Sequence, residues 1–181
     1  MNVHPWHDVS VGKKQPKIVN AIIEIPKDST VKYEVDKESG LLKLDRYMYS
    51  SMHYPGDYGF IPQTLWEDGD PLDVFVLTHR PSLPGILCEA KVIGVIRMVD
   101  QDEKDDKIIA VHANDPRYSQ WDSIKDIPKH FLAEIKHFLE TYKELEKKTV
   151  KVFKILDAEE AYKDIQKGID LYQKKFGKKK D

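Results

Sequence analysis

Alternating apolar and polar positions in the first two thirds of the chain predict a series of short strands. β-branched residues fill the run KIVNAIIEI at 17–25, and Pro26 with a polar cluster ends it as strands usually end. Runs at 30–35 and 41–44 predict two more strands, joined by a polar connection in which Gly40 suits a hairpin with a positive φ. Further apolar runs bounded by Pro, Gly or acidic residues predict strands at 72–77, 86–98, 107–112 and 149–155.

Two later segments follow the helical period instead. Apolar residues recur at steps of three and four after Pro128, which predicts a helix that continues to about Lys147. A second helix is expected from Asp157 to Gly177, with Glu160 placed as in a capping box. Early strands, late helices and no regular alternation indicate an α+β fold, mainly β, around a small closed or sandwiched sheet, and argue against a parallel Rossmann-type sheet.

The composition is that of an ordinary globular domain. The 181 residues are 40% hydrophobic and 33% charged, so we expect one domain spanning residues 1–181. The 29 Lys and Arg against 31 Asp and Glu give a net charge of −2, which provides no positive field for nucleic acid or an anionic membrane. No apolar stretch approaches the roughly 20 residues that span a bilayer. The lone Cys88, read as a small buried hydrophobe, excludes an internal disulfide. We therefore expect a soluble, cytoplasmic protein without nucleic-acid or membrane partners.

The segment DGDPLD at 68–73 is the most informative stretch of the chain. In an extended chain Asp68 and Asp70 share a side, and Asp73 follows at the start of a strand. Clustered carboxylates repel one another unless they are neutralised, and oxygen ligands are those that Mg²⁺ or Mn²⁺ prefers. The pattern predicts a site for a divalent cation. The alternative is a solvated turn, because Asp, Gly and Pro are also ordinary turn residues.

A second acidic segment, DQDEKDDK at 100–107, joins two predicted strands. Such a run is usually an exposed hairpin loop, but two acidic loops in one small domain favour a metal site. Neither segment has the glycine and glutamate spacing of an EF-hand. The sequence also lacks a Walker lysine motif, a dinucleotide glycine fingerprint, HExxH and GxSxG. Phosphoryl or metal-assisted hydrolysis is the class of chemistry that remains.

A highly charged phosphate substrate also needs cations and hydroxyl donors in structured segments. Lys32 qualifies because it shares a strand face with Glu34, although both could line an outward polar face. Arg46 qualifies too, with a surface ion pair to Asp45 as its alternative. Further candidates are hydroxyl or ammonium groups whose alternative is aromatic or core packing: Tyr54 and Tyr58 in a loop rich in Gly and Pro, and Tyr142 and Lys143 on the first helix.

Taken in order, these residues resemble the soluble family I inorganic pyrophosphatases of prokaryotic type. The anchor DGDPLDV at 68–74 is similar to the family's DxDPxDv signature. Six further matches follow the family's order: Glu24 in IEIP, Lys32-Tyr-Glu34, Arg46, YPGDYG at 54–59, the loop with Asp100, Asp105 and Lys107, and Tyr142-Lys143. The resemblance covers nearly the whole chain. It implies an OB-like closed five-stranded β-barrel with flanking helices, two of them long and C-terminal. It also implies a homohexamer and Mg²⁺-dependent hydrolysis of pyrophosphate to two orthophosphates, in which several metals activate a water for in-line attack and Mn²⁺ or Zn²⁺ can substitute.

The resemblance also implies roles for single residues. The metal-binding carboxylates are Asp68, Asp70, Asp73, Asp100 and Asp105, with Glu24 acting through water and Glu34 in support. The phosphate-binding set is Lys32, Arg46, Tyr58, Lys107, Tyr142 and Lys143, with Tyr54 lining the site. Asp70 is expected to accept a proton from the attacking water, and the other catalytic residues are Arg46, Tyr58 and Lys143. Two positions depart from some bacterial members, Gln101 in place of glutamate and Thr141 in place of histidine. The first leaves metal affinity open, and the second gives no basis for a histidine-based pH switch of assembly.

Two alternatives remain at this stage. A non-catalytic OB-fold module that binds a polyanion would share the barrel, but it would need a basic face with stacking aromatics where this chain has clustered aspartates. A metal-dependent hydrolase for another phosphoanhydride would share every residue above, and only substrate profiling separates it.

Overall fold

The computed structural model describes residues 3–177. The strands are β1 (Ile18–Ile25), β2 (Val31–Val35), β3 (Leu42–Tyr47), β4 (Asp57–Phe60), β5 (Asp73–Leu77), β6 (Leu87–Asp100), β7 (Glu103–Lys104), β8 (Lys107–His112) and β9 (Val150–Asp157). The helices are α1 (Lys129–Thr141) and α2 (Ala158–Phe176), with short 3₁₀ turns at Ile124–Asp126 and Glu144–Glu146.

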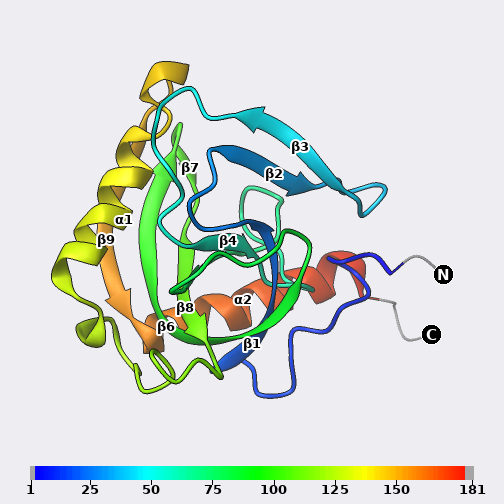
Figure 1. The fold of residues 1–181 in the computed structure, drawn as a ribbon. Coiled ribbons are helices and arrows are strands. Elements are labelled where there is room, and N and C mark those ends of the chain that lie inside the picture. Colours follow the sequence, from blue (N-terminus) through cyan, green and yellow to red (C-terminus); the bar gives the residue numbers. More distant parts are fainter. Residues whose placement is uncertain (1–2, 178–181) are drawn as a thin grey trace.

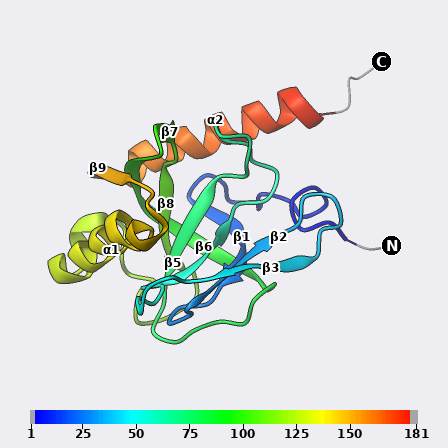
Figure 2. The ribbon, with the colours of Figure 1, turned by 90° about the horizontal axis from the view of Figure 1, so that it is seen from above.

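Five strands pair into a ring, in the order β1-β4-β5-β8-β6 and back to β1. Every pair in the ring is antiparallel except β5 with β8. The long β6 extends beyond the ring, where it also pairs with β7 and β9. The β2–β3 hairpin forms a separate two-stranded sheet that lies on a different side of the ring from α2 (Figures 1 and 2). This arrangement confirms the expected mainly-β α+β class with a five-stranded, OB-like ring.

The ring strands are buried on both faces because alternate residues face two different cores. On β5, Val74 and Val76 belong to one cluster, which also contains Ile165 of α2. Phe75 and Leu77, the residues between and after them, belong to a second cluster that includes Ile135, Phe138 and Leu139 of α1. A strand has a side-chain period of two, so one run of apolar residues serves both cores.

Both helices present an apolar stripe to the sheet. In α2 the buried residues recur at steps of three and four: Ala158, Ala161, Asp164, Ile165, Gly168 and Tyr172. The side chain of Asp157 accepts the backbone N–H of Ala158 and begins the helix, as expected of an N-cap. Glu160, the expected capping-box partner, instead contacts Lys163 within the helix and Arg97 on the sheet.

The first helix is shorter than its apolar period predicts. It ends at Thr141 rather than near Lys147, and a 3₁₀ turn follows that closes at Lys147 with a left-handed φ of 58°. Leu145, which fits the periodic pattern, is 64% exposed. The early end is a tertiary effect, because the turn directs Tyr142 and Lys143 toward charged groups on the sheet.

Strand β4 is missing from the sequence-based expectation, which treated residues 54–59 as a loop. Its glycine has a packing reason: a Cβ at Gly59 would lie 1.8 Å from the carbonyl oxygen of Ile22 on β1. Glycine therefore permits close pairing here instead of marking a turn.

Cys88 is partly exposed rather than fully buried. The expected solvated lysine tail at 178–180 lies outside the described residues. No helix within residues 3–177 is both long and apolar enough to cross a membrane.

Candidate active site

A cavity of about 250 Å³ gathers most of the residues singled out from the sequence. Its lining includes Lys32, Tyr54, Tyr58, Asp68, Asp70, Asp73, Asp100, Asp105, Lys107, Tyr142 and Lys143, together with Gln101 and Glu103. We call this cavity the acidic cleft. Glu24 and Glu34 instead line an adjoining cavity of about 470 Å³ that shares Lys32, Tyr58, Asp70 and Asp73 with the cleft. Arg46 lines neither cavity.

The first acidic loop, residues 66–73, is folded by its own hydrogen bonds. Gly69 has a φ of +89°, which a residue with a side chain rarely adopts. The backbone N–H of Asp70 donates to Asp68 Oδ1 at 2.9 Å, and the N–H of Trp66 donates to the Asp70 carbonyl at 2.6 Å. The loop delivers Asp68 and Asp70 to one cavity, and Asp73 follows at the start of β5.

The second acidic loop, residues 100–106, reverses the chain between β6 and β8. Gln101 and Asp102 have φ values of 49° and 71°, so the turn passes through the left-handed region. Asp100 at the end of β6 and Asp105 before β8 both line the acidic cleft. The two loops approach each other because β5 and β8 are parallel neighbours whose first residues lie at the same end of the ring.

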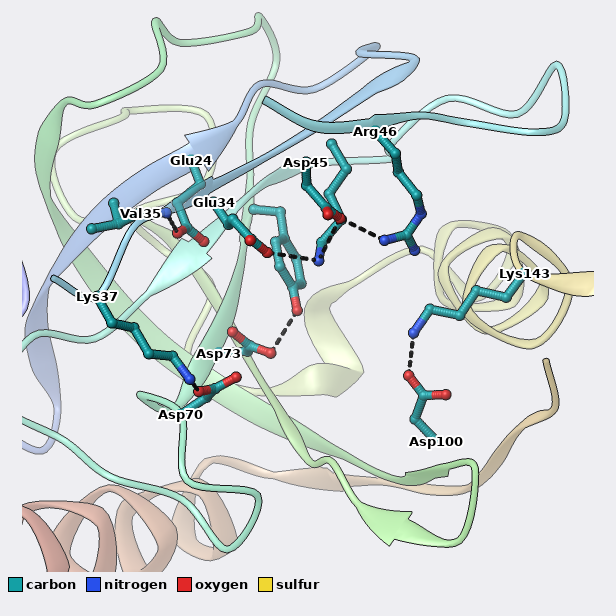
Figure 3. A network of polar contacts seen from close by, with 12 residues as sticks. Glu24, Glu34, Val35, Lys37, Asp45, Arg46, Asp70, Asp73, Asp100 and Lys143 are labelled. Carbon is teal, nitrogen blue, oxygen red and sulfur yellow. Dashed lines mark hydrogen bonds and ion pairs between the residues drawn. The ribbon is translucent and has the colours of Figure 1, made fainter. Parts of the chain in front are cut away.

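Lysine side chains contact the aspartates of the cleft (Figure 3). The Lys107 ammonium donates to both Asp73 and Asp105, and its side chain is 5% exposed. Lys143 donates to Asp100, and Lys37 from the β2–β3 turn donates to Asp70. These contacts show that the carboxylates face a space that cations can reach.

The β2–β3 hairpin supplies the other cations. Lys32 Nζ lies 3.4 Å from Glu34 Oε2 and 3.2 Å from Asp45 Oδ2, so Lys32 and Glu34 share a face, as the alternation predicts. Arg46 forms the ion pair with Asp45 that the sequence offered as an alternative, at 2.5 Å. Its Nε also donates to Glu146 at 2.9 Å, which ties the hairpin to the turn after α1. In Figure 3, Arg46 and Lys143 lie on the same side of the site.

Burial and mutual repulsion shift the titration of the acidic groups. Burial raises the pKa of Glu24 to about 8, although its carboxylate accepts the backbone N–H of Val35 at 2.6 Å. Burial, with the nearby Asp73 and Asp105, raises the pKa of Asp68 to about 6. Burial also raises the pKa of Asp73, even though Lys107 opposes the shift. Burial therefore disfavours the charged form of these carboxylates in the protein without a bound cation.

One tyrosine keeps its proton for the same reason. Tyr58 donates its hydroxyl to Asp73 Oδ2 at 2.6 Å. Burial, and then the charge of Asp73, holds the pKa of Tyr58 well above its usual range. The group is therefore a hydrogen-bond donor at neutral pH.

The donor set fits a hard divalent cation. The cleft aspartates offer only oxygen ligands, which suit Mg²⁺, Mn²⁺ or Ca²⁺. Asp100 Oδ1 is buried without a hydrogen-bond partner within residues 3–177, which is costly unless another group satisfies it. Among those same residues no three His, Cys, Asp or Glu side chains are already close enough to form a complete metal centre.

Sequence reasoning missed three residues that either contact the predicted set or line the cleft with it. Lys37 contacts Asp70, Glu103 lines the cleft, and Glu146 holds Arg46. Each lies in a turn or on a segment whose charges are typical of exposed surface. The positions of Lys37 and Glu146 depend on contacts between residues distant in the chain, so no local pattern signals them. Glu103 lies in the second acidic segment, but nothing in that segment distinguishes it from the other acidic residues.

Comparison with known proteins agrees with this site. The sequence model described as inorganic pyrophosphatase matches residues 21–173. Soluble inorganic pyrophosphatase 2 of Chlamydomonas reinhardtii is 52% identical over 173 residues, which cover 96% of this chain and 90% of that protein. A soluble inorganic pyrophosphatase of Solanum tuberosum is 53% identical over 93% of this chain and 80% of its own length. The crystal structure of the inorganic pyrophosphatase from Thermus thermophilus superposes with a TM-score of 0.89 at 44% identity, covering 91% of this chain and 97% of that one. The chain therefore belongs to the inorganic pyrophosphatase family, the enzymes that hydrolyse pyrophosphate.

Proposed function

We propose that this enzyme hydrolyses pyrophosphate to two orthophosphates in the acidic cleft, with Mg²⁺ as its metal. The observation that carries the proposal is the convergence of five aspartates with lysine and tyrosine donors in one cavity of about 250 Å³. A cavity of aspartates alone would repel pyrophosphate, and one of lysines alone would hold no metal. The mixture suits a substrate that arrives as an anion together with divalent cations.

Asp68, Asp70, Asp73, Asp100 and Asp105 would hold the metal ions, with Glu24 acting through water and Glu34 in support. Bound divalent cations neutralise the charge of the substrate and lower the pKa of the attacking water. The family is generally metal-dependent, and oxygen-only ligands favour Mg²⁺, with Mn²⁺ or Zn²⁺ as substitutes.

Asp70 is the proposed proton acceptor for the attacking water. Its side chain is 48% exposed, so water reaches it, and its position is fixed from behind by hydrogen bonds within its own loop. The Lys37 ammonium contacts this carboxylate from the β2–β3 turn.

The remaining residues bind and orient the two phosphates. Lys32 and Lys107 would hold the phosphate under attack, and Arg46, Tyr142 and Lys143 would stabilise the charge that develops on the leaving phosphate. Tyr58 donates from its protonated hydroxyl, and Tyr54 lines the wall of the cleft. Arg46 acts from the rim, where Glu146 and Asp45 fix its guanidinium.

We also propose that residues 1–181 form a single domain that assembles as a homohexamer in the cytoplasm. The hexamer follows from the resemblance to short prokaryotic-type chains, and the Thermus thermophilus chain matches this one over 97% of its length. Light scattering of the purified protein measures the assembly directly. A mass near that of six chains is expected, and a monomer would contradict this part of the proposal.

The polyanion-binding alternative is not favoured. It requires a basic surface that attracts phosphate without metal, whereas this cleft contains Asp68, Asp70, Asp73, Asp100 and Asp105. The chain also carries a net charge of −2.

The decisive experiment is orthophosphate release from pyrophosphate at neutral pH with Mg²⁺, with EDTA and with Ca²⁺. We expect rapid release with Mg²⁺, none with EDTA and strong inhibition with Ca²⁺, because Ca²⁺ prefers longer and more variable coordination. A parallel panel of other phosphoanhydrides tests substrate choice. Folded protein saturated with Mg²⁺ that releases no phosphate from pyrophosphate would overturn the proposal.

A further inference from the structure

A buried carboxylate lies directly behind the second acidic loop. Asp106 is 2% exposed. Its Oδ1 accepts the backbone N–H of Met98 at 3.1 Å, and its Oδ2 accepts from Arg97 Nη1 at 2.7 Å. The backbone N–H of Asp105 also donates to the carbonyl of Met98, at 3.1 Å. The start of β8 is thus fastened to the end of β6 by a side chain as well as by the backbone.

Because side chains alternate along an extended segment, the contacts of Asp106 also affect the residues on either side of it. Asp105 and Lys107 flank Asp106, line the acidic cleft and contact each other. Successive residues of an extended segment point to opposite sides. Asp106 points away from the cleft toward Arg97, so holding its carboxylate also fixes the direction of both neighbours.

The ion pair between Asp106 and Arg97 is also connected to α2. Arg97 donates to Asp164 of that helix, and its Nη2 lies 3.8 Å from Glu160. Lys104 Nζ lies 3.6 Å from Asp106 Oδ2 and 3.4 Å from Oε1 of Glu67, which belongs to the first acidic loop. These charges lie outside the cleft, and none of them lines it.

We propose that Asp106 is a positioning residue, which holds Asp105 and Lys107 in the orientation that metal and phosphate require. The inference rests on the proposed function of the acidic cleft. Residues that orient metal ligands from behind commonly affect metal affinity although they never touch the metal. Asp106 would orient Asp105 and Lys107 through its own contacts with Arg97 and the Met98 backbone, and its side chain does not line the cleft.

The test compares two isosteric variants. Each replaces one of the two carboxylates that accept a hydrogen bond from Arg97 by an amide. Asp106→Asn keeps an oxygen for the Met98 N–H, but it places an uncharged amide against the guanidinium. Asp164→Asn removes the contact on the helix side and leaves the loop contacts intact. We expect Asp106→Asn to weaken Mg²⁺ binding by about tenfold, measured by titration calorimetry without substrate. We expect Asp164→Asn to change it less than about twofold.

Thermal unfolding in EDTA and steady-state kinetics complete the test. If Asp106 only stabilises the fold, both variants lower the midpoint of unfolding and neither changes Mg²⁺ affinity, which would overturn the inference. If Asp106→Asn does not fold, Arg97→Lys takes its place in the test. This variant keeps the positive charge but cannot contact both Asp106 and Asp164 as the guanidinium does, so we expect a smaller loss of Mg²⁺ affinity. Unchanged Mg²⁺ affinity in folded Arg97→Lys would also overturn it. Wild-type protein that neither binds Mg²⁺ nor hydrolyses pyrophosphate would contradict the proposed function instead.

Discussion

The two acidic loops present aspartates to the same cleft but are held in different ways. Residues 66–73 fold around Gly69, with a hydrogen bond from the Asp70 backbone to the Asp68 side chain. Residues 100–106 depend on Asp106, buried against Arg97 and the backbone of β6. The turn of the first loop is shaped by hydrogen bonds within the loop, although Glu67 also contacts Lys167 of α2. The second loop is held by a buried side chain against β6, and Arg97 of that strand contacts α2 in turn.

This difference shows how a metal-binding surface can be built from two kinds of support. A local turn leaves its carboxylates partly exposed, and Asp70 is 48% exposed. A buried anchor keeps its carboxylates more enclosed, with Asp100 and Asp105 at 15% and 16%. The exposed loop therefore leaves Asp70 open to water, and the enclosed loop keeps Asp100 and Asp105 in contact with Lys143 and Lys107.

The largest effect is expected from a change at Asp70, the proposed proton acceptor on the first loop. Asp70→Asn keeps the shape of the side chain but removes its ability to accept a proton, so kcat should fall by about 10²- to 10⁴-fold at saturating Mg²⁺. Orthophosphate release measures the rate, and circular dichroism confirms the fold. Asp102→Asn is the matched control, because Asp102 is an exposed aspartate on the second loop with a φ of 71° that asparagine tolerates. Near-wild-type turnover of Asp70→Asn would remove Asp70 from the role of base.

A smaller effect should follow from breaking the local turn itself. Gly69→Ala meets no atom within 4 Å but must adopt a φ of +89°, which costs about 1–2 kcal/mol for an L-residue. We expect the loop to relax and the Mg²⁺ concentration for half-maximal activity to rise several-fold. Gly85→Ala is the control, with a φ of +81°, equally open space and a position in the loop before β6 that does not line the cleft. Equal effects of the two variants on the Mg²⁺ requirement would show that Gly69 does not shape the site.

The smallest effect on activity is expected from a buried carboxylate outside the cleft, whose histidine partner titrates and so affects stability. Asp57 Oδ2 lies 3.7 Å from His112 Nε2, and the side chain of Asp57 is fully buried. Asp57, and then Cys88, raise the pKa of His112 to about 10 from an ordinary value of 6.5. Because the folded protein holds the proton more tightly, this stabilisation is complete below pH 6.5 and is lost as the pH rises through about 10.

Thermal unfolding of the wild type and of His112→Gln between pH 6 and 10 tests this contribution. The wild type should lose up to about 1.4 kcal/mol of unfolding free energy per pH unit within that interval, and the variant should lose less. His79→Gln, at an exposed histidine, is the control and should follow the wild type. Parallel curves for the wild type and His112→Gln would show that the buried pair does not control stability.

Local patterns account for the parts of the molecule that depend on neighbouring residues. The apolar runs at 107–112 and 17–25 predicted β8 and β1 to within one residue at each end. The DGDPLD segment predicted a carboxylate cluster, since its turn is encoded by Gly69 and by the hydrogen bond between Asp68 and Asp70. Resemblance to a family then extended the set of candidate residues to segments with no informative local pattern.

Tertiary structure decided everything that depends on which strands meet. Gly59 lies in a strand because β1 approaches too closely for a side chain, whereas its sequence context is typical of a turn. The first helix ends at Thr141 although the apolar period continues, and the turn that follows brings Lys143 to Asp100. Asp106 shares a run of charges with Asp105 and Lys107, yet it points to the opposite side. The physical reason is that side-chain periodicity records which faces are buried, whereas the pairing of distant strands determines which charges meet across the cleft.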